Sequence, residues 1–510
     1  MKRPSRSEPP AAETPGTPLL GSPAAGAEDV TTAGAAMRPG HHGRPPAALD
    51  PVTAGDTAGP RAGAAEVTVA WAPVAPAPVV THVDAWPPVP RARADRPVWL
   101  HVGTLLDGTS TSPAHDVHLV YDHEAIRFVG EGGRTPPRAL VRAGQDRPDL
   151  VAPEHTVLPG LVDAHTHLFL EGGELEAGRR AAQLHRSPDE LLADARARLE
   201  RLVRLGLAGV RDAGDRHGVG LALSRLYQRP DRPLMPYLES PGAAIHRRGR
   251  YGRFMGDALE SHPTAHACVA ARVAAGADRI KLIATGVIDF RAGRVTAAPQ
   301  LTTADVAELV TAAASFERQT FAHASGEDGI EHALAGGVHS IEHGFFLLPD
   351  QLARMRDQRT AWVPTFAPVQ AQLDHAAAFG WDEDVADNLR RILDQHANSL
   401  RRAHELGVPI VAGSDAGSGG VPHGFGLLDE LELMERAGLP PLAVIRAATG
   451  TGAERLAYRE PIGRIRPGYR SRFIVTHHSP LETVAHLRLR RTIVFDGEVL
   501  HTGVVEATGM

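Results

Sequence analysis

The sequence predicts an α/β fold, a (β/α)8 TIM barrel with a small β-sandwich, preceded by a disordered N-terminal tail. The barrel prediction rests on short apolar runs that alternate with helical patterns between residues 160 and 456. Eight strand–helix units over about 300 residues suit one barrel, whose chemistry lies at the carboxyl ends of its strands. The predicted strands begin near residues 160, 208, 236, 279, 320, 338, 361 and 409.

Helix start signals separate these strands. Ser187 precedes Pro188 and Glu190, which is the pattern of an N-cap followed by proline at the first helical position. This helix is predicted to reach about Leu205 and to end at Gly206. Further helices are predicted over about 264–275, 302–318, 328–335, 349–358, 385–406 and 441–456.

Two β-rich regions flank the barrel, at residues 96–159 and 457–510. Both contain short strand-like runs separated by turn signals such as Asp-Gly and Gly-Gly. The first region is too small to form a stable sheet alone. We therefore expect both regions to combine into one small β-sandwich domain.

The first 95 residues have a different composition. Residues 1–94 hold 17 of the 41 prolines and show neither a helical nor a strand period. Such a segment cannot bury enough apolar surface to offset the entropy lost on ordering. We interpret residues 1–95 as a disordered tail, within which 67–82 is the one stretch that could be extended.

Composition excludes several classes of protein. The net charge is -6, the basic residues are scattered, and no run of eighteen apolar residues occurs, which argues against nucleic acid and membrane partners. No apolar segment follows Met1, so a secretory signal is not expected. The single cysteine, Cys268, excludes an internal disulfide and a cysteine metal cluster. We expect a cytoplasmic protein.

The first barrel strand ends in His165-Thr166-His167. Residues two apart on a strand project to the same side, so both imidazoles can bind one divalent ion. A lone His-X-His is explained as well by two hydrogen-bonded histidines. The other strand ends favour the metal, because they carry Asp212, Lys281, His323, His343 and Asp415.

Lys281 is singled out by composition. Of 54 basic residues only Lys2 and Lys281 are lysine, and Lys2 lies in the predicted tail. A plain positive charge could have been arginine, whereas a site that needs a primary amine could not, because guanidinium does not deprotonate. Chance survival of one lysine remains the alternative.

Seven segments resemble the amidohydrolase superfamily, in particular the branch of Xaa-Pro dipeptidases, related carboxypeptidases and imidazolonepropionase-like proteins. The resemblance covers roughly Val98 to Thr502 and excludes the N-terminal region. The segments are PGLVDAHTHL, GVRDAG, GADRIKLIATG, HASGEDGI, HSIEHG, GSDAG and LELMERAGLPPLAVIRAATGTGAERL.

The resemblance implies a centre of two divalent metal ions, for which zinc is expected. His165 and His167 would bind the first ion, and His323 and His343 the second. Lys281 would be carboxylated by CO2 and bridge the ions. Asp415 would bind metal and act as the catalytic proton shuttle, whereas Asp212 is expected to hold a hydrogen bond.

The implied activity is hydrolysis of an amide carbon–nitrogen bond by a metal-activated hydroxide. The expected substrate is a small molecule, either a dipeptide or an N-acyl amino acid. Two alternatives remain open: a mononuclear cyclic-amide hydrolase of the imidazolonepropionase type, and a non-catalytic barrel that only binds. Related enzymes are often oligomers, so a homo-oligomer is also left open.

The loop after the third strand departs from the family pattern. Where relatives carry Gly-Gly-His, this chain has AAIHRRGRYGRFMG, with four arginines between positions 247 and 253. Arginine can bind a substrate carboxylate with two hydrogen bonds. We therefore predict substrate contacts by His246, Arg250 and Tyr251. The alternative is a solvated basic loop.

Overall fold

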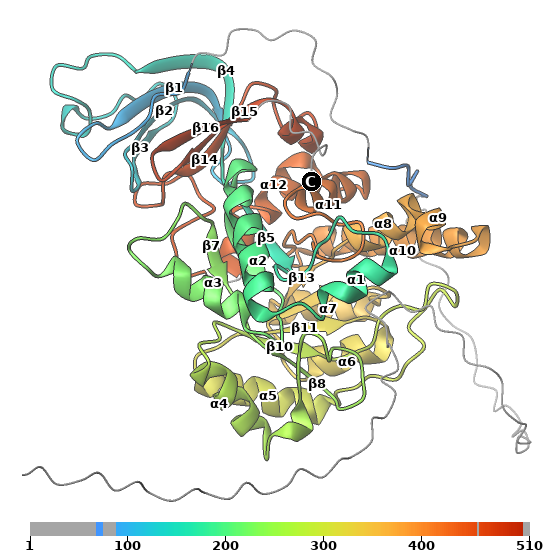
Figure 1. The fold of residues 1–510 in the computed structure, drawn as a ribbon. Helices are drawn as coiled ribbons and strands as arrows, with labels where there is room; N and C mark the ends of the chain where they lie inside the picture. The colour runs from blue at the N-terminus through green and yellow to red at the C-terminus, as the bar shows by residue number, and fades with distance from the viewer. Residues whose placement is uncertain (1–67, 75–87, 456–457, 503–510) are drawn as a thin grey trace, which may run out of the picture.

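The computed structural model describes residues 68–74, 88–455 and 458–502 (Figure 1). Most of the predicted tail lies outside the described residues. The fold is α/β with parallel sheets, as the sequence predicted. The strands are β1 (Val98–Leu105), β2 (Ala114–Tyr121), β3 (Ile126–Gly130), β4 (Leu150–Pro159), β5 (Leu161–Thr166), β6 (Leu207–Asp212), β7 (Tyr237–Glu239), β8 (Ala244–His246), β9 (Gly256–Ala258), β10 (Ile280–Ile283), β11 (Thr320–Ala324), β12 (Ser340–His343), β13 (Ala361–Val363), β14 (Arg472–Thr476), β15 (Arg491–Phe495) and β16 (Glu498–Thr502).

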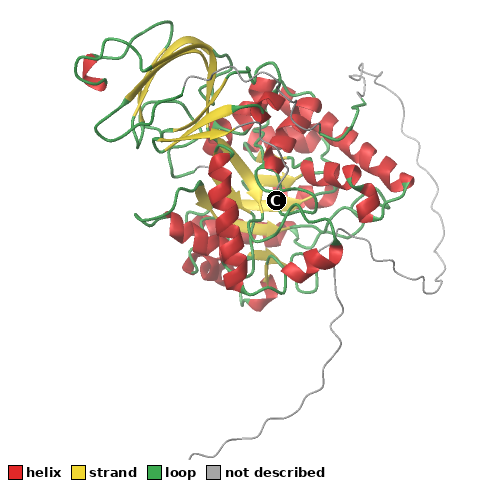
Figure 2. Ribbon diagram, turned by 45° about the horizontal axis from the view of Figure 1, so that its top comes forward, coloured by secondary structure: helices red, strands yellow, loops and turns green. Residues whose placement is uncertain are grey.

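Strands from both ends of the described chain pair in one seven-stranded sheet. Its order is β16-β15-β14-β4-β1-β2-β3. Val117 of β2 and Val494 of β15 belong to the same apolar cluster although three strands lie between them, so the sheet curves around a core of its own (Figure 2). Val89 and Ala92 are buried in this cluster, so its packing begins before the predicted boundary at residue 96. The domain boundaries themselves stay a prediction.

The central part of the chain forms two parallel sheets. One has the order β13-β12-β11-β10-β8-β9 and the other β5-β6-β7. The predicted third strand is divided into β7 and β8 by Pro241, which has no N–H to donate, and Gly242, whose φ is 60°. The segment predicted as the eighth strand forms isolated bridges instead of a ladder, from Ile410 to Trp362 and from Ala416 to Thr166.

Helices follow most of these strands. Ser187 and Glu190 form the capping box that opens α2, and Thr302 and Asp305 form the one that opens α5. The α-helices are α1 (Ala177–Gln183), α2 (Pro188–Arg204), α3 (Val219–Tyr227), α4 (Ala265–Ala274), α5 (Thr303–Ser315), α6 (Glu327–Ala335), α7 (Pro349–Gln358), α8 (Ala367–Asp374), α9 (Ala376–Phe379), α10 (Glu383–Leu406), α11 (Phe425–Arg436), α12 (Pro441–Ala447) and α13 (Gly450–Arg455). Short 3-10 turns cover Arg138–Leu140, Leu259–Ser261 and Val484–Arg488.

Residues 68–74 differ from the prediction of a disordered tail. Trp71 is only 8% exposed and stacks on Phe366 with ring centroids 6.0 Å apart. Its indole Nε1 donates to Asp394 at 2.8 Å, and the same carboxylate accepts from the Val69 amide. An aromatic residue packed in this way anchors the segment to α10 and to the loop after β13.

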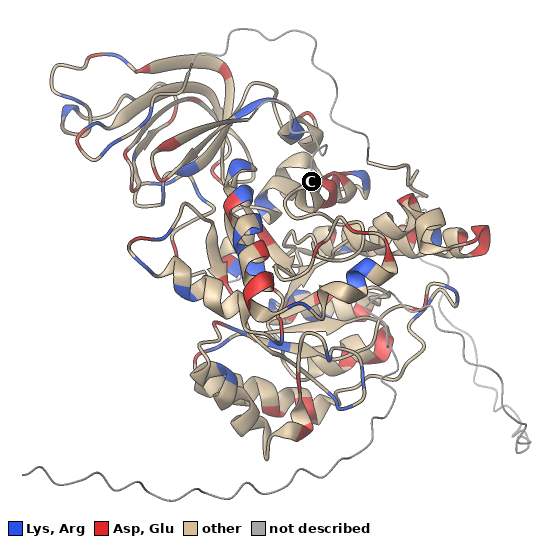
Figure 3. Ribbon diagram, in the orientation of Figure 1, with Lys and Arg blue, Asp and Glu red and all other residues tan. Residues whose placement is uncertain are grey.

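Positions of Lys and Arg and of Asp and Glu are interspersed along the ribbon, as their scattering in the sequence suggested (Figure 3). Among the residues that the structure describes, no helix combines the length and the apolar character needed to cross a bilayer.

Candidate metal centre

Four histidines and a lysine, positioned by the four strands β5, β10, β11 and β12, line one cavity of about 320 Å³. His165 and His167 come from β5, and their ring centroids are 5.6 Å apart. The His343 ring lies 5.0 Å from that of His165 and 4.5 Å from that of His323. Lys281 of β10 reaches the same cavity. The structure thus brings together all the histidines that the sequence predicted as metal ligands.

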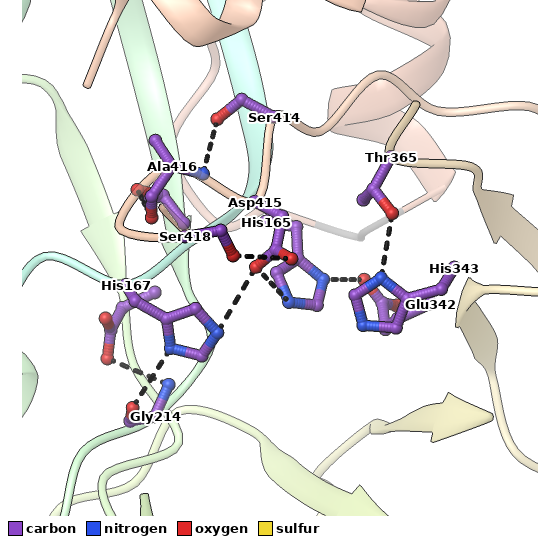
Figure 4. A network of polar contacts seen from close by, with 12 residues as sticks. His165, His167, Gly214, Glu342, His343, Thr365, Ser414, Asp415, Ala416 and Ser418 are labelled. Carbon is purple, nitrogen blue, oxygen red and sulfur yellow. Dashed lines mark hydrogen bonds and ion pairs between the residues drawn. The ribbon is translucent and has the colours of Figure 1, made fainter. Parts of the chain in front are cut away.

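Asp415 completes a compact group with the β5 histidines (Figure 4). One ligand atom from each of His165, His167 and Asp415 lies within 4.8 Å of the other two, and all three side chains are buried. Asp415 Oδ1 is 3.4 Å from His167 Nε2 and 3.6 Å from His165 Nε2. Burial opposes ionisation of Asp415, but the two histidines hold its pKa below its usual value.

The Glu342 carboxylate lies against His165 and was not among the site residues predicted from the sequence. His165 Nδ1 is 2.6 Å from Glu342, and Arg211 Nη2 donates to the same oxygen at 2.7 Å. Burial works against ionisation of Glu342, but Arg211 and His165 keep its pKa well below its usual range. An ionised carboxylate only accepts, so Nδ1 carries the proton and Nε2 offers its lone pair to the cavity.

Two buried polar atoms in the cavity have no hydrogen-bond partner within the described parts of the chain. They are His165 Nε2 and Lys281 Nζ. Burial, assisted by Arg211, lowers the pKa of Lys281 to about 8. An unpaired buried amine is costly, so these two atoms indicate a missing group that would bind both.

The backbone is strained at three residues of the candidate site. His343, Thr365 and Asp415 have φ of 66°, 52° and 53°, a left-handed conformation that residues other than glycine rarely adopt. The turn at His343 breaks strand alternation, so Glu342 and His343 both approach His165. Thr365 Oγ1 lies 2.8 Å from His343 Nδ1 and orients that ring.

Of the three residues predicted to contact the substrate, one lines the cavity and two do not. Tyr251 lines the cavity, with its ring centroid 5.4 Å from that of His323. Arg250 instead donates to the Ala298 carbonyl, and His246 Nδ1 lies 2.7 Å from the Arg247 carbonyl. Neither side chain is among those lining the cavity. This geometry favours the solvated basic loop for the arginines.

Among the described residues a single arginine, Arg180, lines the cavity, and it was not predicted from the sequence. Its Nη1 donates to the carbonyls of Glu171 and Glu174, and its Nη2 to that of Gly417. Its position in α1 could not be linked to the site from the sequence, because ten residues separate the end of β5 from that helix. Asp212 accepts from Ser240 Oγ and the Leu168 amide, which confirms the hydrogen-bonding role expected of it.

Comparison with known proteins agrees with this arrangement. The model of the Amidohydrolase family matches residues 156–500. Ochratoxinase of Aspergillus niger is 25% identical over 435 residues, covering 81% of this chain and 88% of that protein. An uncharacterised protein of Mycobacterium tuberculosis is 31% identical over 333 residues, covering 64% of this chain and 80% of its own.

A solved structure extends the likeness to the fold. The crystal structure of a Xaa-Pro dipeptidase with bound methionine in the active site matches with a TM-score of 0.65 and 26% identity. The match covers 80% of this chain and all of that one. With the family model spanning more than half of its length, the chain belongs to the amidohydrolase family.

Proposed function

We propose that this protein is a metal-dependent hydrolase that cleaves the amide bond of an N-acyl amino acid or dipeptide. The observation that carries the proposal is the buried group of His165, His167 and Asp415 beside the unpartnered Lys281 amine. Membership of the amidohydrolase family supports hydrolysis of a carbon–nitrogen bond.

The residues present fit two divalent ions, with zinc favoured by the imidazole donors. His165, His167 and Asp415 would hold one ion, and His323 and His343 the other. A carbamate on Lys281 would supply them with an anionic oxygen ligand: the neutral amine would bond to the carbon of CO2 and lose a proton. The bound ions would supply Lewis acidity that polarises the scissile carbonyl and acidifies water.

Asp415 is suited to move the proton. Its carboxylate is ionised and faces the cavity, and Ser418 Oγ donates to its second oxygen at 3.1 Å. It would take a proton from the attacking water and return it to the leaving amine, as general base and then general acid. Glu342 and Thr365 would hold the rings of His165 and His343 during this cycle.

The cavity wall indicates the kind of substrate. It is mostly apolar, which suits a bulky hydrophobic group on the acyl or the amine side. The apolar lining comprises Leu170, Phe254, Met255, Val287, Ile288, Phe290, Phe345, Val369 and Phe379.

Arg180 contributes a positive charge to this mostly apolar cavity wall. Three carbonyls accept hydrogen bonds from its guanidinium, which has five N–H donors, so donors remain for a carboxylate. We infer that it binds the free α-carboxylate of an N-acyl amino acid.

Hydrogen bonds also support a closed barrel. Val411 donates to Trp362 at 2.9 Å, and Ala164 donates to Ala412 at 3.0 Å, so the segment around residue 411 links β13 to β5. On the other side, Asp278 donates to Ser240 at 2.9 Å and joins the start of β10 to the end of β7. We infer that the two parallel sheets form one (β/α)8 barrel over residues 160–456.

A hydrolysis screen tests the proposed function. Purified protein is incubated with dipeptides and N-acyl amino acids that vary in apolar bulk, with and without prior chelation. We expect amine release from substrates with a bulky apolar group, lost on chelation and restored by zinc. Release that survives complete metal removal would contradict the proposal.

A further inference from the structure

A second group of metal-binding side chains lies in the seven-stranded sheet. Glu154 and His155 of β4 and His477, which follows β14, each place one ligand atom within 4.8 Å of the other two. Glu154 Oε1 is 3.0 Å from His155 Nδ1, and the two imidazole centroids are 5.1 Å apart. None of the three lines the cavity of the candidate metal centre.

The strand register explains why the two histidines meet. β4 and β14 are antiparallel, and their ladder ends with Thr156 opposite Thr476. One further step in that register sets His155 opposite His477. Directly opposed residues have Cβ atoms about 4.5–5.5 Å apart, which lets two imidazoles share one ion.

Burial and local composition suit a bound cation. His155 is only 2% exposed and therefore fixed in place, whereas the Glu154 side chain is about half exposed and gives an ion access from solvent. His478 lies beside the group, with its ring centroid 5.1 Å from that of His477. A fourth nitrogen donor is thus at hand, and water can complete the coordination.

We propose that Glu154, His155 and His477 form a second divalent-cation site, separate from the catalytic cavity. Two imidazoles and one carboxylate suit zinc, nickel or copper better than calcium or magnesium, which prefer oxygen ligands. The ion would join β4 to the end of β14, segments more than 300 residues apart in the chain. Its role would be structural, because an ion that binds only the folded sheet stabilises it.

The experiment uses the full chain carrying His165→Ala and His167→Ala, which weakens the catalytic site. The protein is stripped with a chelator and dialysed against Zn²⁺, and bound zinc is measured by elemental analysis. Adding His477→Ala should remove one equivalent of zinc per chain and abolish the rise in Tm that zinc produces. Adding His185→Ala, an exposed histidine outside both groups, should change neither.

The result that overturns the proposal is equal zinc content and equal Tm shift with and without His477→Ala. Glu154→Gln gives an independent reading, because it removes a ligand charge from an exposed position. It should weaken zinc binding about tenfold or more, since even groups behind the ligands contribute that much. If the chain carrying His165→Ala and His167→Ala does not fold, zinc content and the Tm shift are compared with and without His477→Ala in the otherwise unaltered chain. There His477→Ala should cost one zinc and leave hydrolysis unchanged.

Discussion

Glu342 lies 2.6 Å from Nδ1 of His165 and accepts a hydrogen bond from it, although 177 residues separate them in the chain. The contact joins β12 to β5 and fixes which nitrogen of His165 faces the cavity. Arg211 of β6 neutralises the carboxylate from behind, so three strands contribute to the orientation of one imidazole. A ligand held in this way has little freedom to lose when it binds an ion.

Glu342→Gln should lower zinc affinity about 10–100-fold, the usual effect of removing a partner behind a metal ligand. Arg211 would also lose its buried counter-charge, so some loss of stability should accompany the change. Competition against a chromogenic chelator measures the affinity. Glu331→Gln, which removes a half-exposed ion pair with Arg354, is the control and should bind like wild type. Unchanged affinity in Glu342→Gln would show that the contact does not tune the site.

The sequence could predict which histidines meet in the cavity, because they lie at the carboxyl ends of predicted parallel strands, and this needs no long-range information. It could also place α2, whose capping box is local to Ser187 and Glu190. Glu342 escaped notice because strand alternation predicts that it points away from His343, and only the left-handed turn at His343 brings both to His165. A left-handed turn cannot be predicted from the sequence when the residue that adopts it is not glycine.

Other differences came from tertiary packing. Composition alone indicated disorder around Trp71, but a pocket made by Phe366 and Asp394 captures the indole. The loop arginines drew attention by their number, although Arg250 donates to the Ala298 carbonyl and Arg180 is the described arginine that lines the cavity. Both outcomes depend on surfaces formed by distant parts of the chain.

Arg180→Ala should reduce kcat/KM for substrates with a free α-carboxylate about 10–150-fold, which corresponds to about 1.5–3 kcal/mol for a charge-assisted hydrogen bond. The amidated forms of the same substrates should lose much less, because they make no such bond. The ratio of kcat/KM for the free substrate to kcat/KM for the amidated substrate distinguishes a loss of carboxylate binding from a loss of the loop contacts that Arg180 also makes. Arg250→Ala should leave the ratio unchanged. Equal losses on free and amidated substrates would assign Arg180 a structural role only.

Asp415→Asn should reduce kcat about 10²–10⁴-fold, the usual contribution of a general acid–base group. An amide has the size of the carboxylate but cannot carry the proton. Steady-state kinetics should be run at saturating zinc, with the metal content of each sample measured in parallel. A reduction below tenfold with metals retained would move proton transfer to another residue.

We expect the buried Glu430 to make the free energy of unfolding depend on pH. It is completely buried, accepts from the Ala367 amide at 2.8 Å, and has a pKa that burial raises from 4.5 to about 8. A raised pKa means that the folded chain holds a proton that the unfolded chain has lost. The stabilising contribution is therefore complete below pH 4.5 and is lost as the pH rises through 8.

Glu430→Gln, which cannot titrate, should accordingly gain stability relative to wild type between pH 5 and 8 and gain no more above it. Urea unfolding midpoints at one-unit intervals measure this. Glu405→Gln, at an exposed surface pair with Arg402, should show a constant difference. A constant difference for Glu430→Gln as well would mean that the folded protein holds Glu430 ionised.

We propose above that a binuclear centre bridged by Lys281 carries out amide hydrolysis. The most direct measurement is zinc titration of the stripped protein while hydrolysis is followed, in the His477→Ala background so that the sheet site does not contribute. Two equivalents per chain should restore full turnover in the presence of bicarbonate, and Lys281→Arg should recover neither both ions nor the rate, because guanidinium cannot form the carbamate. Restoration by one equivalent would indicate the mononuclear alternative. Full turnover in metal-free protein, or in Lys281→Arg, would contradict catalysis by a binuclear centre bridged by Lys281.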